Sequence, residues 1–386
     1  MEFSSLPIPA CKKFSGYKPC LSYKNCLENG CQDDTPENRM GKKILIISLD
    51  ALGNVLYNTP LLFAIKRKYP ESTIYWLTLP NAEKILQNNP LIDHLFLWTD
   101  EHRMILRQIL FDYVFNGDKS DYACAFTNET QAKRKLGFLL NADGKIVPAN
   151  ESAMYSYQLG IDDRLKFREN TRSGVDIAHE VFELEWKYDP CIFEFSQEEK
   201  LFIESYKSEI GYDSSKCCIG LNTGCSTLFP NKKMTVEQHV RIINELGKDE
   251  NIRLLLLGGR EDTERNDEIF AKLSPEAKSR TINTPSTMGI RRGACFMNIA
   301  DVVISGDSFG MHLALALRKY VIVWFGLSCQ AEIELYNYGQ KLFPEGLECS
   351  PCWKKTCPRN LECIDMIDLD KVIEYSRNFA DNIFKR

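Results

Sequence analysis

Residues 41–78, which read GKKILIISLDALGNVLYNTPLLFAIKRKYPESTIYWLT, decide the fold that we expect for this chain. The continuous apolar run in KKILIISL has the length of a strand and is typical of a parallel strand buried on both faces. A glycine turn and apolar residues at helical spacing follow, Pro70 ends that helix, and TIYWLT gives a second strand. A strand, a helix and a strand at this spacing form a βαβ unit.

The same alternation begins again in the second half of the chain. Strand-like runs start at Cys218 (CIGLNTG), Ile252 (IRLLLLGG), Asp301 (DVVISGD) and Tyr320 (YVIVWFG), and helical patterns separate them. Two successive α/β halves predict two Rossmann-like domains that face each other across a cleft. Ligands of such sheets bind outside the carboxyl ends of the strands.

Length and composition exclude several classes of protein. A chain of 386 residues with 44% hydrophobic and 26% charged residues is typical of a soluble globular protein of about two domains. With a net charge of −5, the chain lacks the excess of basic residues that is typical of nucleic-acid binders, so we expect no nucleic acid as partner. No apolar run approaches the ~18–20 residues that span a bilayer. The start MEFSSLPIPACKKF also lacks the layout of a signal peptide, so we expect a cytoplasmic protein.

Two stretches at predicted strand ends have the residues of a ligand site. In SLDALGN (48–54), Gly53 lets the backbone approach a ligand and Asp50 is the carboxylate beside it. In NTGCSTLFPNKK (222–233), hydroxyls, small residues and two lysines suit a diphosphate. The alternative interpretation of the second stretch is a polar loop with solvated lysines.

Two further stretches are acidic. In LGGREDTE (257–264), Glu261 or Asp262 would accept hydrogen bonds from a ribose, although acidic residues are also common in the first turn of a helix. In GDSFGMHLALAL (306–317), Asp307 precedes a helix that begins near His312. The start of this helix would offer main-chain N–H groups to phosphate, or Asp307 would simply cap the helix. No P-loop and no G-x-G-x-x-G occurs, which argues against a P-loop kinase or a dehydrogenase.

These motifs, in this order, resemble glycosyltransferase family 9, the ADP-heptose:lipopolysaccharide heptosyltransferases. The resemblance rests on LDALGNVLYNTPLL, NTGCSTLFPNKK, LGGRED and DSFGMHLALAL, extends from about residue 42 to residue 385, and implies the GT-B fold. The run AEIELYNYG (331–339), followed by CSPCWKKTCPRNLEC (349–363), is similar to a subgroup with cysteine metal fingers. Some members of that subgroup glycosylate autotransporter proteins rather than lipid.

The resemblance implies roles for individual residues. Lys232 would be the cation on the donor diphosphate, Ser226 and Thr227 would contact phosphate, and Asp262 or Glu261 would bind the ribose. Asp307 and His312 would belong to the sugar–phosphate site. The full set of expected donor-binding residues is Thr223, Ser226, Thr227, Lys232, Glu261, Asp262, Asp307, Ser308, Gly310 and His312.

The expected catalytic loop departs from the family. In the family this loop usually reads G-D-V, and its aspartate is taken as the catalytic base. In this chain Asn54 stands at the position of that aspartate. An amide cannot accept a proton at neutral pH, so Asp50, four residues earlier, is the candidate replacement. A second departure is GLS from Gly326, where the family tends to have G-P-T.

The implied reaction is an inverting sugar transfer. A base takes the proton of an acceptor hydroxyl, the hydroxyl attacks the anomeric carbon in line, and the nucleotide diphosphate leaves. Lys232 and helix N-termini would stabilise the leaving charge without a catalytic metal. The expected donor is a nucleotide-diphosphate sugar, with ADP-heptose first.

The expected acceptor is a lipopolysaccharide or lipid A core, or a protein, and a peripheral contact with the inner membrane would fit the lipid acceptor. Asn54 leaves a second interpretation open: a weak or silent GT-B scaffold that binds a nucleotide sugar without transferring it.

Clustered cysteines favour metal ligation over disulfides in a reducing compartment. Four of the 15 cysteines form C-x2-C-x4-C-x5-C, which can wrap a tetrahedral structural zinc or iron: Cys349, Cys352, Cys357 and Cys363. A looser set near the N-terminus would hold a second ion, share one site with the first, or remain free thiols: Cys11, Cys20, Cys26 and Cys31.

The expected organisation has five parts. They are a cysteine-rich segment (1–40), an N-terminal Rossmann-like domain on the acceptor side (41–195), a C-terminal Rossmann-like domain for the nucleotide sugar (196–345), a cysteine finger (346–366) and a C-terminal helix that packs back across the domains (367–386).

Overall fold

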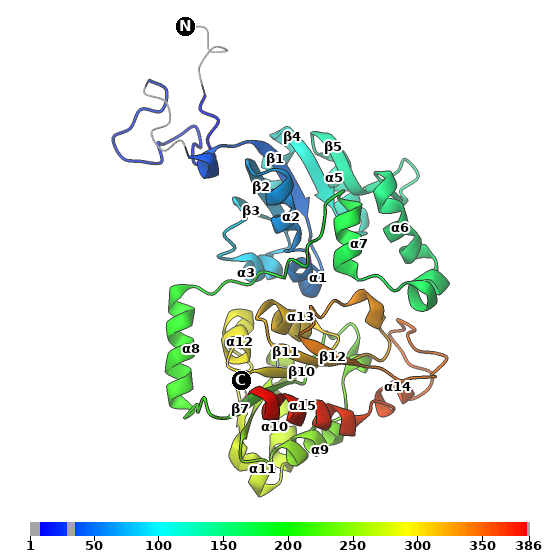
Figure 1. The fold of residues 1–386 in the computed structure, drawn as a ribbon. Coiled ribbons are helices and arrows are strands. Elements are labelled where there is room, and N and C mark those ends of the chain that lie inside the picture. The colour runs from blue at the N-terminus through cyan, green and yellow to red at the C-terminus, as the bar shows by residue number, and fades with distance from the viewer. Residues whose placement is uncertain (1–7, 29–34, 384–386) are drawn as a thin grey trace.

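Two α/β domains, each built on a six-stranded sheet, make up the computed structural model, which describes residues 8–28 and 35–383 (Figure 1). The first sheet has the strand order β3-β2-β1-β4-β5-β6, and β6 is antiparallel to β5. Its strands are β1 (Lys42–Ile47), β2 (Ser72–Thr78), β3 (His94–Leu97), β4 (Phe111–Asn116), β5 (Ala132–Leu140) and β6 (Ile146–Pro148). The helices of this half are α1 (Leu52–Tyr57), α2 (Leu61–Lys68), α3 (Glu83–Leu86), α4 (Asp100–Gln108), α5 (Asp121–Glu129), α6 (Met154–Ile161) and α7 (Gly174–Val181).

The first βαβ unit forms where the sequence predicts it. Ile44, Leu45, Ile46 and Ile47 of β1 are at most 1% exposed, so both faces of this strand are covered. β1 pairs in parallel with β2 on one side and with β4 on the other. The continuous apolar run of β1 therefore belongs to the centre of the sheet.

The second sheet is entirely parallel, with the order β12-β11-β10-β7-β8-β9. Its strands are β7 (Cys217–Asn222), β8 (Ile252–Leu257), β9 (Thr281–Asn283), β10 (Val302–Gly306), β11 (Tyr320–Trp324) and β12 (Gly339–Leu342). The helices of this half are α8 (Gln197–Glu209), α9 (Val236–Leu246), α10 (Thr263–Lys272), α11 (Pro275–Arg280), α12 (Gly289–Met297), α13 (Phe309–Ala316), α14 (Glu362–Asp365) and α15 (Leu369–Ile383). In Figure 1, α8 runs along the side of this domain next to α12.

The C-terminal helix differs from the prediction. Instead of packing back across the domains, α15 packs on α9 and against β7, β10 and β11 of the C-terminal domain. Its apolar residues Val372, Ile373 and Ala380 are buried in the core of that domain. This correction has a simple reason: the C-terminal sheet needs a cover on that face, and the apolar face of α15 supplies it.

The two domains meet through α1 and α13. Gly53 of α1 lies so close to α13 that a Cβ atom at this position would stand 2.7 Å from Cδ2 of His312. The Tyr57 hydroxyl adds a hydrogen bond across the domains, since it donates to the carbonyl of Glu332 at 2.8 Å. Because α1 follows β1 and α13 follows β10, the carboxyl edges of the two sheets face each other, where open α/β sheets bind ligands.

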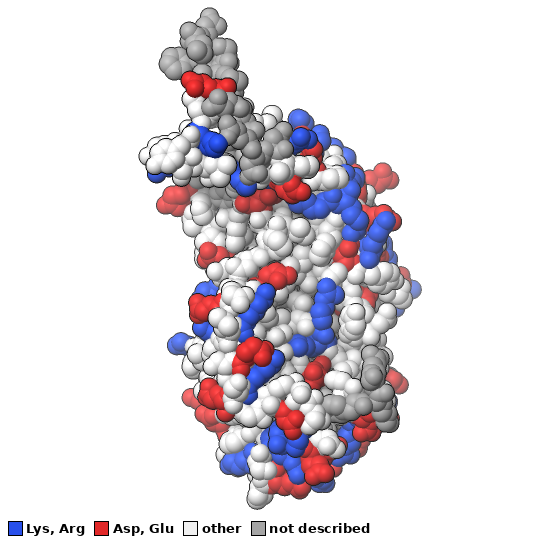
Figure 2. Space-filling view, turned by 60° about the vertical axis from the view of Figure 1, so that its left-hand side comes forward, with Lys and Arg blue, Asp and Glu red and all other residues white. Residues whose placement is uncertain are grey.

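The surface has no single sign of charge. Basic and acidic side chains are interspersed over the face in Figure 2, consistent with a net charge of −5. Within residues 8–28 and 35–383, no helix is both long enough and apolar enough to cross a bilayer.

Candidate active site

Lys232 stands at the facing edges of the two sheets. It ends the 3₁₀ turn Pro230–Lys232, and its carbonyl accepts a hydrogen bond from the Trp324 indole at 2.9 Å. Its ammonium lies 2.6 Å from Oδ2 of Asp307, which follows β10. Both side chains are nearly buried, 13% and 12% exposed. The structure thus brings the second and the fourth predicted stretch together in one ion pair.

Burial sets the charges around this pair. Burial alone would raise the pKa of Asp307, but its neighbours together, with the Lys232 ammonium first, hold this pKa below its ordinary value. Burial lowers the pKa of His312 to about 4, so its imidazole is neutral at pH 7. The His312 ring meets the Tyr57 ring edge-on at 5.3 Å, and its Nδ1 has no hydrogen-bond partner among the described residues.

Asn222, at the end of β7, is a residue that the sequence analysis missed. Its amide donates to Oγ of Ser308 at 3.1 Å and to Oγ of Ser305 at 3.0 Å, which joins the ends of β7 and β10. A Cβ atom on Gly310 would stand 2.5 Å from this amide, so Gly310 permits the close approach. The available signal was a polar residue at the last position of a buried strand.

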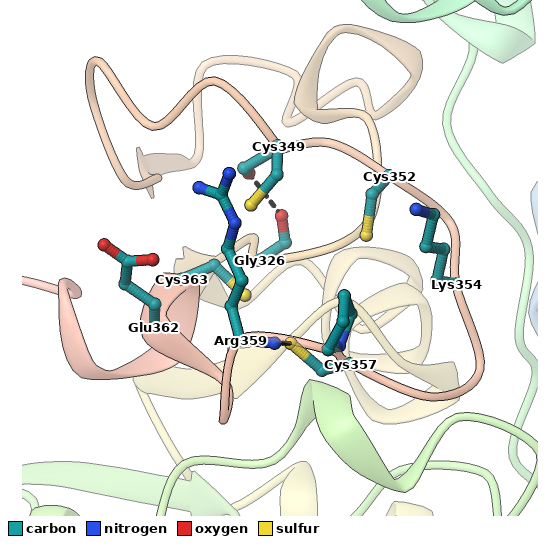
Figure 3. Close-up of a pocket in the computed structure, with 10 residues that line it drawn as sticks. Gly326, Cys349, Cys352, Lys354, Cys357, Arg359, Glu362 and Cys363 are labelled. Atoms are coloured by element: carbon teal, nitrogen blue, oxygen red, sulfur yellow. Dashed lines mark hydrogen bonds between the residues drawn. The ribbon is translucent and has the colours of Figure 1, made fainter.

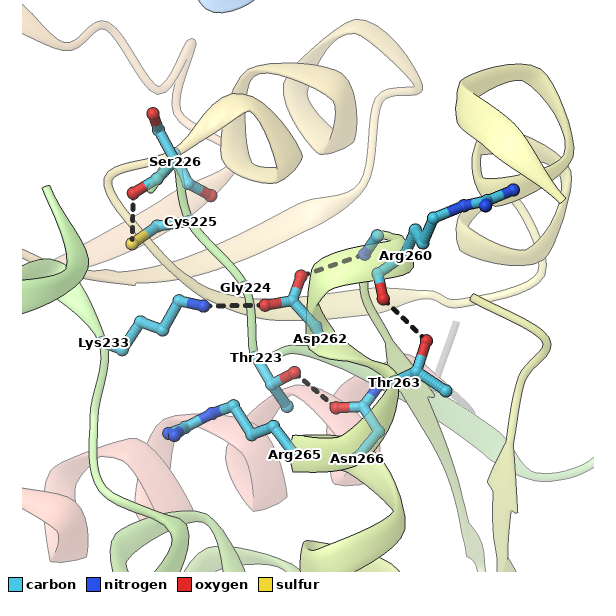
Figure 4. Close-up of polar contacts among 12 residues, drawn as sticks. Thr223, Gly224, Cys225, Ser226, Lys233, Arg260, Asp262, Thr263, Arg265 and Asn266 are labelled. Carbon is cyan, nitrogen blue, oxygen red and sulfur yellow. Dashed lines mark hydrogen bonds and ion pairs between the residues drawn. The ribbon is translucent and has the colours of Figure 1, made fainter. Parts of the chain in front are cut away.

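The loop after β7 is tied to the start of α10 (Figure 4). Thr223 is 1% exposed and donates its hydroxyl proton to Oδ1 of Asn266 at 2.5 Å. Asp262 is 3% exposed, accepts the N–H of Gly259 at 3.0 Å, and pairs with Lys233 at 2.8 Å. Thr223 and Asp262 therefore support the loop in this structure.

Other predicted donor contacts remain open to solvent. Glu261 is exposed beside the buried Asp262, and Ser226 and Thr227 are exposed on the loop after β7. The Ser226 hydroxyl accepts the N–H of Leu228 at 3.2 Å, which shapes the turn that leads to Lys232. Of the two acidic residues expected near a ribose, Glu261 is exposed to solvent and Asp262 is buried.

The opposite edge of the site holds two neighbouring aspartates. Asp50 is exposed after β1, and Asn54 is exposed on α1. The carboxylate of Asp118, which follows β4, accepts the N–H of Leu49. Burial raises the pKa of Asp118 to about 7 and the charge of Asp50 adds to the rise, while the Leu49 N–H opposes it. The sequence analysis missed Asp118; its signal was an N-G-D turn at the end of a strand that pairs with β1.

The four C-terminal cysteines line one pocket, together with Gly326, Lys354 and Arg359 (Figure 3). Burial, with a smaller contribution from the neighbouring Cys357, Cys352 and Cys349, raises the pKa of Cys363 to about 11. The sulfur of Cys357 accepts the N–H groups of Arg359 at 3.4 Å and Leu361 at 3.3 Å.

A formed metal site, however, is not what the structure shows. Over residues 8–28 and 35–383, no three His, Cys, Asp or Glu side chains stand close enough together to hold an ion. The raised pKa of Cys363 keeps its side chain as the neutral thiol, which is a weaker metal ligand than the thiolate.

The N-terminal cysteines likewise form no metal-binding group in the part of the chain that the structure describes. Cys11 is buried and bridges to Arg39 in a short β-contact, Cys20 is exposed, and Cys26 is partly exposed. The fourth predicted ligand, Cys31, lies outside the described residues.

Comparisons with known proteins agree with this architecture. The sequence pattern of glycosyltransferase family 9 (heptosyltransferase) matches residues 102–362. Lipopolysaccharide heptosyltransferase 1 of Campylobacter coli is 24% identical over 302 residues, which are 74% of this chain and 84% of the relative.

Solved structures share the fold. A family 9 glycosyltransferase from Veillonella parvula superimposes with a TM-score of 0.68 at 18% identity, over 88% of this chain and 97% of that one. TibC of enterotoxigenic E. coli, an iron-containing dodecameric glycosyltransferase that has also been solved with ADP-D-beta-D-heptose, has a TM-score of 0.53 at 11% identity, over 90% of this chain and 78% of that one. With the two facing sheets, these likenesses confirm the GT-B fold. Because the family pattern spans more than half of its length, the chain belongs to glycosyltransferase family 9 (heptosyltransferase) and is a glycosyltransferase.

Proposed function

We propose that this enzyme transfers a heptose from ADP-heptose to an acceptor hydroxyl with inversion at the anomeric carbon. The observation that carries the proposal is the buried ion pair of Lys232 and Asp307 between the carboxyl edges of the two sheets. The C. coli relative is named a heptosyltransferase, and TibC has been solved with ADP-D-beta-D-heptose, which supports the choice of donor.

The donor diphosphate binds to Lys232, to the exposed hydroxyls of Ser226 and Thr227, and to the N-terminal N–H groups of α13 after Ser308. Lys232 exchanges Asp307 for a phosphate oxygen when the donor enters, since both partners are anions. A cation held in a largely buried site stabilises the charge that develops on the leaving diphosphate. The ribose binds to Glu261, the exposed acidic residue of its loop.

The acceptor hydroxyl gives its proton to Asp50, which is exposed at the opposite edge. Asp118 binds the Leu49 N–H and so fixes the backbone from which Asp50 projects. The hydroxyl oxygen then attacks the anomeric carbon, and the bond to the diphosphate breaks. A positioned base contributes about 10²–10⁴-fold to such a rate.

The acceptor that we propose is the lipopolysaccharide core, because the C. coli relative is named a lipopolysaccharide heptosyltransferase. Transfer then takes place on the cytoplasmic side, with a peripheral contact of the enzyme at the inner membrane. The cysteine finger (346–366) supports a protein acceptor as the alternative. The subgroup that this finger resembles includes protein glycosyltransferases. Incubation with each acceptor and the same donor distinguishes the two.

The cysteine pocket fits a structural zinc or iron ion held by Cys349, Cys352, Cys357 and Cys363. Four sulfurs border one pocket, which Lys354 and Arg359 also line, and two backbone N–H groups donate to Cys357. When bound, the ion would fix the segment and would take no part in sugar transfer, because a four-thiolate shell leaves no open position. TibC, whose structure contains iron, supports this proposal.

Asn54 supports a second candidate function, a scaffold that binds the nucleotide sugar but turns it over slowly or not at all. It occupies the family's catalytic position with an exposed amide. Turnover by the wild type argues against this candidate. No turnover by the wild type, together with a gain in Asn54→Asp, would establish it.

Calorimetric titration with ADP and ADP-heptose tests the donor site. Loss of a charge-assisted contact corresponds to roughly ten- to hundredfold weaker binding, so Lys232→Ala is expected to fall in that range. Lys248→Ala is the matched control, since Lys248 pairs with Glu245 on the surface. Equal affinity of wild type and Lys232→Ala would remove Lys232 from the donor site and refute the proposal.

A further inference from the structure

The predicted cysteine finger (residues 346–366), called the cysteine segment below, places an aromatic ring beside the proposed donor site. Trp353 directly follows Cys352 and is 41% exposed. Its backbone has a φ of +52°, which bulky residues rarely adopt. The N–H groups of Cys352 and Trp353 both donate to the carbonyl of Leu327, at 3.0 and 2.9 Å. Leu327 follows β11, so the loop after that strand anchors the backbone that carries the indole.

Two lysines, one from each domain, lie over this indole. The Lys232 ammonium is 4.6 Å from its centroid, and the Lys166 ammonium is 5.3 Å from it. The Phe229 ring stands 5.2 Å away and completes an aromatic wall beside Lys232. An ammonium within about 6 Å of an aromatic face is attracted by the ring's quadrupole, and Trp is the strongest partner.

Further contacts hold the segment between the domains. Arg168 of the N-terminal domain donates to the carbonyl of Ser350 at 3.1 Å. Asn231, the neighbour of Lys232, donates to the carbonyl of Lys354 at 2.9 Å. The residues on both sides of Trp353 are therefore bonded to opposite walls of the site.

We propose that Trp353 is a positioning residue that holds the Lys232 ammonium in place for the donor diphosphate, and that the cysteine segment acts on donor binding through it. The proposal rests on the role of Lys232 in the proposed function. Asp307 also holds Lys232, but as an anion it competes with the phosphate. The indole is neutral and remains in contact with the ammonium while the diphosphate binds.

Titration of the full-length protein with ADP tests this role. Loss of a partly buried cation–π contact corresponds to about three- to thirtyfold weaker binding, which is expected for Trp353→Leu. Trp353→Phe keeps an aromatic face and should lose less. Trp98→Leu is the matched control, because Arg103 lies 4.7 Å from the Trp98 ring in the N-terminal domain, and it should bind ADP like the wild type. Wild-type affinity in both Trp353 variants would overturn the proposal.

A double-mutant cycle shows whether Trp353 acts through Lys232. Lys232→Met with Trp353→Leu should bind ADP no more weakly than Lys232→Met alone, because the ring then has no ammonium to hold. Additive losses would overturn the proposal. Thermal melting identifies variants that do not fold, and Trp353→Phe replaces Trp353→Leu if the latter fails. Unchanged affinity in Lys232→Met alone refutes the donor site itself, which separates that failure from the failure of Trp353.

Cys352→Ser tests whether the cysteine segment influences ADP binding through Trp353. The substitution alters the residue before Trp353 and should weaken ADP binding to a similar degree as Trp353→Leu. In the presence of Lys232→Met it should have no further effect. A Cys352→Ser protein that folds and binds ADP like the wild type would show that the segment has no influence on the donor site.

Discussion

The ammonium of Lys232 lies 2.6 Å from a carboxylate oxygen of Asp307, although 75 residues separate them in the chain. The contact joins the turn after β7 to the start of α13, and both side chains are nearly buried. Removing one member of such a pair leaves a buried charge without a partner, which is more costly than an exposed pair would be. In the proposed function, the free enzyme holds the Lys232 ammonium against an internal anion that the donor diphosphate replaces.

Asp307→Asn tests that exchange through stability. The substitution leaves the Lys232 charge unpaired, so we expect the free energy of unfolding to fall by on the order of 3 kcal/mol. ADP then supplies the missing anion, and the rise in melting temperature on adding ADP should be larger in Asp307→Asn than in the wild type. Thermal melting with and without ADP measures both effects. An equal ADP-induced rise in the two proteins would contradict the exchange.

Asp50→Asn should reduce kcat by about 10²–10⁴-fold, because the proposed base can no longer accept the acceptor proton. ADP affinity should not change, since Asp50 lies on the acceptor side. Steady-state kinetics with ADP-heptose and calorimetry with ADP measure the two quantities. Asn54→Ala, on α1 just after Asp50, is the matched control and should keep most of the activity. Unchanged kcat in Asp50→Asn would show that Asp50 is not the base.

The stability of the protein should depend on pH through Asp118. Its pKa rises from an ordinary value near 3.9 in the unfolded chain to about 7 in the folded protein. The folded state therefore binds the proton more tightly, so this stabilising contribution is fully present below about pH 4 and is lost as the pH rises to about 7. Its size is at most roughly 4 kcal/mol, from about three pKa units.

Asp118→Asn is the variant that checks this. Its free energy of unfolding should vary less between pH 4 and pH 7 than that of the wild type, as measured by urea denaturation at several pH values. Asp121→Asn, three residues along the chain, provides a control that should keep the wild-type slope. The same slope in Asp118→Asn as in the wild type would show that Asp118 does not titrate in this range.

Metal analysis of the purified protein should find one zinc or iron ion per chain. Cys352→Ser should lose it, with a lower melting temperature, because a three-thiolate shell binds the ion less tightly. Cys20→Ser should keep the ion, since Cys20 is exposed and belongs to no metal-binding group among the described residues. A metal-free wild type as stable as protein reconstituted with zinc or iron would exclude a structural metal.

Local patterns predicted much of the fold. The apolar run of β1, the helical pattern after it and the run of β2 identify a βαβ unit, because strand burial and helical periodicity are properties of neighbouring residues. The motif order also predicted the family. Local patterns do not predict packing between distant elements. The amphipathic pattern of α15 predicts a helix, but it does not show which domain the apolar face covers.

The candidate site shows the same division. The sequence itself shows that Lys232 and Asp307 follow predicted strands, that an asparagine stands at position 54, where the resemblance leads us to expect an aspartate, and that four cysteines are closely spaced near the C-terminus. Only the tertiary structure decided that Lys232 pairs with Asp307, that Asp118 binds the backbone beside Asp50, and that Trp353 lies over Lys232. The physical reason is that strand and helix patterns depend on neighbours in the chain, whereas burial, ion pairs and pKa shifts depend on groups that folding brings together from distant positions.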